Sequence, residues 1–130
     1  MAASFKPDGY STVSPYLIAT GAQKVIDFLK QAFGARELRR YDMPDGSIMH
    51  AEVRIGDTVV MVGDAGDNWP AVPAHLHVYV DSVDTIYERA LAAGGISVQP
   101  PERKGDDPDR RGGVKDPAGN TWWIATQVAR

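Results

Sequence analysis

The side chains best suited to chemistry lie in two short stretches of the chain. His50 and Glu52 alternate with apolar residues in one stretch, and His75 and His77 do so in another. An imidazole can ligate a metal or move a proton near neutral pH, and a nearby carboxylate can orient it. Three hypotheses follow: a divalent-metal site of His50, Glu52 and His75, metal-free acid–base catalysis with His75 or His77 as the catalytic residue, or purely structural hydrogen bonding.

Other reactive groups are few. The chain of 130 residues has no cysteine, which excludes a thiolate nucleophile, a disulfide and a Cys-based zinc site. The polar stretch 100–111 is rich in charge but lacks the glycine-rich strand-to-helix turn of a phosphate site. We expect it to be a solvated loop, which could close over a ligand with Arg110 or Arg111 as its charge partner.

The elements that position these residues repeat along the chain. Apolar spacing of 3.6 residues predicts helices over 22–33 and 83–93, each ended by glycine. The apolar positions of the first helix fall on those of the second with a constant offset of 61. Strands are predicted on both sides of each helix, over 13–20, 36–42, 47–55 and 58–63, then over 74–80, 96–99, 112–115 and 121–127.

This repeat predicts a single domain over residues 1–130 made of two βαβββ modules. Module 1 covers about 11–63, module 2 covers about 74–128, and a linker rich in Gly, Asp and Pro joins them. One helix on one small sheet cannot bury both faces of that sheet. The modules must therefore pack on each other or on a partner chain.

Strand alternation predicts which side chains share a face. In the strand 74–80, His75, His77 and Tyr79 face one way and the apolar residues 76, 78 and 80 the other. In the strand 47–55, His50 and Glu52 oppose an apolar row at 49, 51, 53 and 55. Trp122 and Trp123 are out of phase, so Trp122 should pack under a helix and Trp123 on the opposite face.

Three segments carry a resemblance to a known family. The strand 75–81 (HLHVYVD), the helix after it, and the segment 111–126 (RGGVKDPAGNTWWIAT) resemble the glyoxalase/bleomycin resistance/dioxygenase superfamily, also called vicinal oxygen chelate proteins, and most closely its PhnB-like branch. The resemblance covers nearly the whole chain. It implies an α+β fold in which two βαβββ modules form curved mixed sheets around a concave pocket, and it implies a homodimer.

The same resemblance indicates which residues take the place of the family's metal ligands. Enzymes of the family hold one divalent metal with four side chains, and the corresponding positions here are Ser14, Met61, His75 and Trp123. Only His75 suits a divalent metal well, because serine is a poor ligand, methionine is soft and tryptophan has no free lone pair. No cofactor is therefore predicted.

The favoured function is consequently a small-molecule-binding protein of the bleomycin resistance type. The alternative is a divalent-metal-dependent lyase, isomerase or dioxygenase with a displaced site at His50, Glu52 and His75, and the sequence leaves open whether any reaction is catalysed. The residues expected to line the ligand pocket are Ser14, Tyr16, His50, Glu52, Met61, His75, His77, Tyr79 and Trp123. A core filled by these aromatic residues, without a cavity, is the competing interpretation. Trp69 in the linker is expected to cover the pocket or a dimer seam, or to lie on the surface.

Net charge and hydropathy bear on whether the protein has a nucleic-acid or membrane partner. The formal net charge is −3, and no basic cluster is free of acidic neighbours, so a nucleic-acid partner is not predicted. No apolar stretch reaches membrane-spanning length, and the first residues do not have the pattern of a signal peptide. We therefore expect a cytoplasmic protein whose partners are a small organic ligand and a second copy of the chain.

Overall fold

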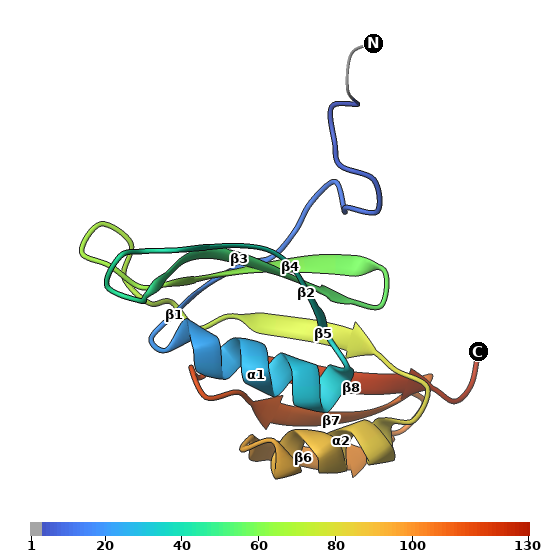
Figure 1. Ribbon diagram of the computed structural model, residues 1–130. Helices are drawn as coiled ribbons and strands as arrows, with labels where there is room; N and C mark the ends of the chain where they lie inside the picture. The colour runs from blue at the N-terminus through green and yellow to red at the C-terminus, as the bar shows by residue number, and fades with distance from the viewer. Residues whose placement is uncertain (1–3) are drawn as a thin grey trace.

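The computed structural model describes residues 4–130 and contains two helices and eight strands (Figure 1). The first half comprises β1 (Tyr16–Ala19), α1 (Ala22–Phe33), β2 (Arg36–Asp42), β3 (Ile48–Ile55) and β4 (Thr58–Asp64). The second half comprises β5 (His75–Tyr79), α2 (Val83–Ala92), β6 (Ile96–Glu102), β7 (Asp109–Lys115) and β8 (Thr121–Gln127).

Each half forms its own four-stranded sheet. The strand orders are β1-β4-β3-β2 and β5-β8-β7-β6, so the two sheets have the same topology. In each sheet the first strand pairs in parallel with the last, and the remaining pairs are antiparallel. The predicted α+β fold with two βαβββ modules is confirmed, and the sheets are mixed because the helix connection places strands one and four side by side.

Local chemistry explains where the helices begin and end. The carboxylate of Asp64 accepts hydrogen bonds from the backbone N–H of Ala22, at the start of α1, and of Ile48. Gly34 ends α1 with a φ of 67°, a left-handed conformation that glycine adopts without steric cost. Ser82 caps α2 by accepting from the backbone N–H of Thr85.

The two modules share one hydrophobic core. Each helix covers one face of its own sheet, and the two helices contact each other (Figure 1). Phe33, at the end of α1, packs on Trp122 of β8 with ring centroids 5.3 Å apart. Space here is tight, because a Cβ added at Gly95 would lie 2.4 Å from Cγ1 of Val114. Trp122 is therefore buried under the helices as predicted, while Trp123 lies on the other face.

Two local features differ from the expectations. Half of the polar stretch expected to be a loop over 100–111 is strand, since β6 runs to Glu102 and β7 starts at Asp109. Prolines at 100 and 101 are tolerated because β6 is an edge strand. The apolar row of β3 is broken at Met49, because the pairing of β2 with β3 shifts between Tyr41 and Asp42. Met49 is exposed and Ile48 is buried in its place.

Residues 4–130 contain no helix that is both long enough and apolar enough to cross a membrane.

Candidate functional site

One face of the first sheet carries several of the predicted site residues. Met61 of β4 lies between Tyr16 of β1 and Glu52 of β3 in the strand register, so all three point to the same side. His50 lies two residues along β3 and joins them. The prediction that Tyr16, His50, Glu52 and Met61 share a face is therefore confirmed.

Four of the side chains near this face form a continuous hydrogen-bonded chain. The Tyr10 hydroxyl donates to Oε1 of Glu52 at 2.5 Å, and Oε2 of Glu52 lies 2.8 Å from Nε2 of His50. The opposite ring nitrogen, Nδ1 of His50, lies 2.8 Å from the Tyr16 hydroxyl. Glu52 is only 4% exposed, so these bonds are what satisfies its carboxylate. We call Tyr10, Glu52, His50 and Tyr16 the tyrosine–histidine chain.

The tyrosine–histidine chain holds Glu52 ionised. Burial by itself would raise the pKa of Glu52, but the hydrogen bonds donated by Tyr10 and His50 outweigh burial and lower that pKa. The hydrogen bond to Glu52 in turn raises the pKa of Tyr10. Burial, followed by the nearby Glu52 charge, raises the pKa of Tyr16. Both phenols are therefore neutral donors at physiological pH.

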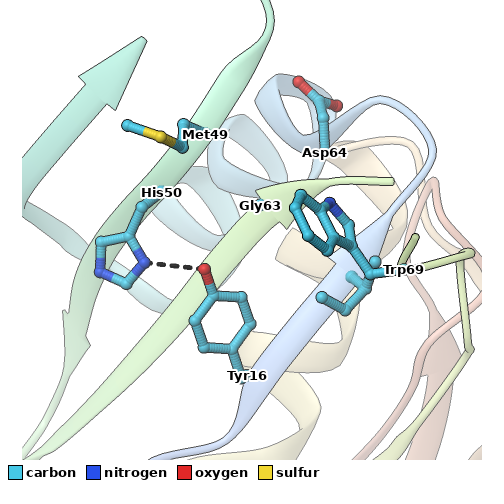
Figure 2. Close-up of a pocket in the computed structure, with 7 residues that line it drawn as sticks. Tyr16, Met49, His50, Gly63, Asp64 and Trp69 are labelled. Carbon is cyan, nitrogen blue, oxygen red and sulfur yellow. Dashed lines mark hydrogen bonds between the residues drawn. The ribbon is translucent and has the colours of Figure 1, made fainter. Parts of the chain in front are cut away.

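A cavity of about 460 Å³ opens beside Tyr16 and His50, at the outer end of the tyrosine–histidine chain (Figure 2). Its lining residues are Tyr16, Ile18, Met49, His50, Gly63, Asp64 and Trp69. Gly63 is needed next to Tyr16, because a Cβ there would lie 3.0 Å from the carbonyl oxygen of Met49 and 3.5 Å from the Tyr16 hydroxyl. The polar side-chain groups at the cavity are the Tyr16–His50 hydrogen-bonded pair, the Trp69 indole N–H and the Asp64 carboxylate, each oxygen of which already accepts one backbone N–H group.

Sequence reasoning had not assigned Met49, Gly63 and Asp64 to the pocket. Alternation placed Met49 on the buried side, and only the shift in strand pairing brings it to the cavity. Trp69 was expected to cover a pocket or a dimer seam or to lie on the surface, and it lines this cavity while remaining 56% exposed.

The equivalent face of the second sheet carries the other predicted residues. The Trp123 indole N–H donates to Nδ1 of His75 at 3.1 Å, and the two rings are stacked. Arg111 donates from Nε to Nε2 of His77 at 3.1 Å, and its other nitrogens bind Asp107 and Asp109.

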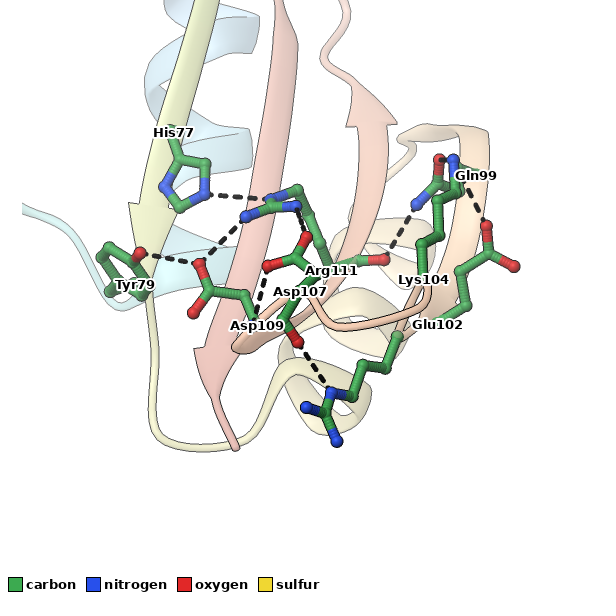
Figure 3. Close-up of polar contacts among 9 residues, drawn as sticks. His77, Tyr79, Gln99, Glu102, Lys104, Asp107, Asp109 and Arg111 are labelled. Carbon is green, nitrogen blue, oxygen red and sulfur yellow. Dashed lines mark hydrogen bonds and ion pairs between the residues drawn. The ribbon is translucent and has the colours of Figure 1, made fainter. Parts of the chain in front are cut away.

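Tyr79 completes this second cluster. Its hydroxyl donates to Oδ2 of Asp109 at 2.7 Å, and that bond raises the pKa of Tyr79 (Figure 3). Asp109 is 4% exposed, so its charge is balanced by Arg111 rather than by water. Arg111 was predicted only as a loop charge. The repeat could have placed Arg111 on this face, because Arg111 follows His50 by the same offset of 61.

The nine predicted lining residues do not form one cavity within the chain. Of these, only Tyr16 and His50 line the cavity on the first sheet. Glu52 lies behind His50, and Ser14 lies just before β1. His75, His77, Tyr79 and Trp123 belong to the second sheet, and no strand of one sheet pairs with a strand of the other.

The displaced metal site is not assembled within one chain. No three His, Asp or Glu side chains between residues 4 and 130 are placed so that they could hold one metal ion. His50 and Glu52 bind each other, while Nδ1 of His75 accepts from Trp123. Within the described residues of one chain, the three side chains of the alternative metal site, His50, Glu52 and His75, therefore do not converge, because His75 lies on the other sheet.

The sequence family and the fold are both found in known proteins. Residues 12–124 match the family model described as Glyoxalase/Bleomycin resistance protein/Dioxygenase superfamily. The chain belongs to this superfamily. The uncharacterized protein Mb0911c of Mycobacterium bovis is 35% identical over 129 residues, which cover 89% of this chain and 83% of Mb0911c.

Solved structures of the superfamily share the fold. TioX from Micromonospora sp. ML1 superposes with a TM-score of 0.76 at 28% identity, covering 90% of this chain and 98% of TioX. The fosfomycin resistance protein FosX from Listeria monocytogenes superposes with a TM-score of 0.69 at 18% identity, covering 89% of this chain and 92% of FosX. The predicted superfamily is thereby confirmed, and the PhnB-like branch stays a prediction.

The residues present do not fit the divalent metal used by enzymes of the superfamily. At the four positions that the resemblance assigns to ligands, this chain has Ser14, Met61, His75 and Trp123. The one good ligand among them, His75, already accepts a hydrogen bond from Trp123 through Nδ1. We therefore derive no chemistry through such a metal.

Proposed function

We propose that this superfamily member binds a small organic molecule with a flat apolar part, and that it does so without the family's metal. The observation that carries the proposal is the cavity of about 460 Å³ on the first sheet. Its volume lies within the range of ligand sites, and it combines apolar walls with one convergent polar pair. Ile18, Met49 and Trp69 form the walls, and Tyr16 and His50 form the pair.

A homodimer fits the same proposal. Neither helix covers the outer faces of the two sheets, and large side chains there remain open: Tyr16 is 47% exposed and Tyr79 is 64% exposed. A second copy that placed its second sheet over the first sheet of its partner would cover both faces. It would also bring His75 and Trp123 of one copy towards the cavity of the other.

Ligand binding is tested by thermal shift with a panel of aromatic and aliphatic compounds, since a ligand that binds only the native state raises Tm. Aromatic compounds should raise Tm of the wild-type chain, and Trp69→Ala should lose that shift because one cavity wall is gone. Met43→Ala is the matched control, because Met43 is exposed but does not line the cavity. Equal shifts in wild type and Trp69→Ala would contradict the assignment of this cavity.

A further inference from the structure

We infer that the cavity on the first sheet selects ligands that carry a hydrogen-bond donor, such as an N–H or O–H group, which would bind the phenol oxygen of Tyr16. The inference rests on the proposed function and deepens it by naming the polar group of the ligand. It follows from the direction of the hydrogen bonds along the tyrosine–histidine chain.

The buried end of the tyrosine–histidine chain, at Glu52, sets which atom donates in each hydrogen bond. An ionised carboxylate accepts hydrogen bonds and cannot donate them. Oε1 of Glu52 accepts from Tyr10, so Oε2 must accept from Nε2 of His50 across 2.8 Å. The proton of a neutral His50 ring therefore lies on Nε2, and Nδ1 is left with a lone pair.

The lone pair on Nδ1 then orients Tyr16. The Tyr16 hydroxyl lies 2.8 Å from Nδ1 and must donate its single proton there. The phenol oxygen keeps its lone pairs at the cavity, so it can only accept from a ligand (Figure 2). A ligand that offers an acceptor atom at this point would place a lone pair of that atom against a lone pair of the phenol oxygen, with no proton between the two atoms.

Among the other lining side chains only Trp69 carries an N–H group, and its Nε1 lies beside Gly66, where an added Cβ would be 3.2 Å from it. The N–H groups near Asp64 are already bound to its carboxylate, and Gly63 brings no side chain. Ile18, Met49 and the ring of Trp69 offer apolar and aromatic surface. The cavity is thus built for a flat apolar body with one donor aimed at Tyr16.

The test compares indole with benzofuran, which have nearly the same shape but differ in carrying an N–H group or a ring oxygen. Binding is followed by NMR titration at about pH 8, above the ordinary histidine pKa of about 6.5. Indole should bind wild type up to about tenfold more tightly than benzofuran, the upper end of what one hydrogen bond contributes. Tyr16→Phe should remove this preference, because the phenol oxygen that accepts from indole is gone.

Tyr41→Phe is the matched control, because Tyr41 lies over the same His50 ring while its hydroxyl bonds to no described residue. It should retain the preference for indole. Equal binding of indole and benzofuran by wild type would overturn the inference and leave the proposed function standing. Binding of neither compound would count against both.

A second measurement needs no ligand. Nitrogen-15 NMR of the histidine rings distinguishes a protonated from an unprotonated ring nitrogen. We expect His50 with its proton on Nε2 and a bare Nδ1 in the folded wild-type chain. A proton on Nδ1 instead would overturn the inference, because Tyr16 would then be free to donate to a ligand.

Discussion

Nε of Arg111 lies 3.1 Å from Nε2 of His77, and the same guanidinium binds both Asp107 and Asp109. A guanidinium has only donors, so Nε2 of His77 must accept with a lone pair. The proton of the neutral ring consequently lies on Nδ1. A protonated His77 would place its own cationic donor against that of Arg111. The stability of the second sheet should therefore depend on pH.

Acid should destabilise the chain through His77. Burial, followed by the Arg111 charge, lowers the pKa of His77 below its ordinary value of about 6.5. The unfolded chain therefore takes up a proton at a higher pH than the folded chain. The stability that His77 contributes is complete above about pH 6.5 and is lost as the pH falls through the folded-state pKa.

Two measurements check this prediction. The NMR titration midpoint of the His77 ring should lie below about 6.5. Urea unfolding of His77→Gln should show a shallower loss of stability between about pH 7 and pH 5 than wild type, because glutamine can accept from Arg111 without titrating. A midpoint above the ordinary histidine value would show that the acidic neighbours dominate instead.

Arg111→Met should cost about 3 kcal/mol of unfolding free energy, because it leaves the buried carboxylate of Asp109 without its cation. Arg110→Met is the matched control. Arg110 pairs with Asp84 on the surface, where an ion pair contributes at most about 1 kcal/mol. Chemical denaturation of both variants tests the contrast, and equal losses would show that Arg111 is no more than a surface cation.

Asp116→Ala should destabilise the chain by about 3 kcal/mol or more, since several buried donors lose their acceptor. The Asp116 carboxylate accepts from the backbone N–H groups of Ala118 and Asn120, and from the side chains of Asn120 and Trp122. Asp106→Ala, on the exposed loop, should stay within about 0.5 kcal/mol of wild type. Thermal unfolding of the two variants side by side decides the matter.

Added divalent metal should not be retained in stoichiometric amount. Within residues 4–130 the histidine and carboxylate side chains form no three-ligand group, and the family's ligand positions hold Ser14, Met61, His75 and Trp123. Dialysis against zinc, manganese, nickel or iron followed by elemental analysis measures retention. One equivalent bound by wild type and lost in His75→Ala would contradict the prediction and revive a metal site, assembled between two chains.

The homodimer is tested by sedimentation velocity. The species should have twice the chain mass of 14.1 kDa. Tyr79→Asp, on the open face of the second sheet, should shift the protein towards monomer because a charge in an apolar interface is costly to desolvate. If the wild-type protein stayed monomeric at all accessible concentrations, the predicted homodimer would be contradicted.

Regular patterning made most of the fold predictable. Apolar spacing located α1 to the residue, and the constant offset of 61 identified the repeated module. Alternation in β5 placed His75, His77 and Tyr79 together on the exposed side. Such patterns can be read from the sequence because the burial of one face of a helix or strand sets the spacing of apolar residues along that element.

The sequence by itself thus determined the modules, the faces of their strands and the presence of only one good metal ligand, His75, at the family's four ligand positions. Only the tertiary structure decided how the candidate residues group. It separated His75 from His50 and Glu52, brought Met49 to the cavity through a shift in strand pairing, and joined Tyr10 to Glu52. These contacts depend on where distant backbone segments come to lie, and side-chain periodicity carries no information about such distances.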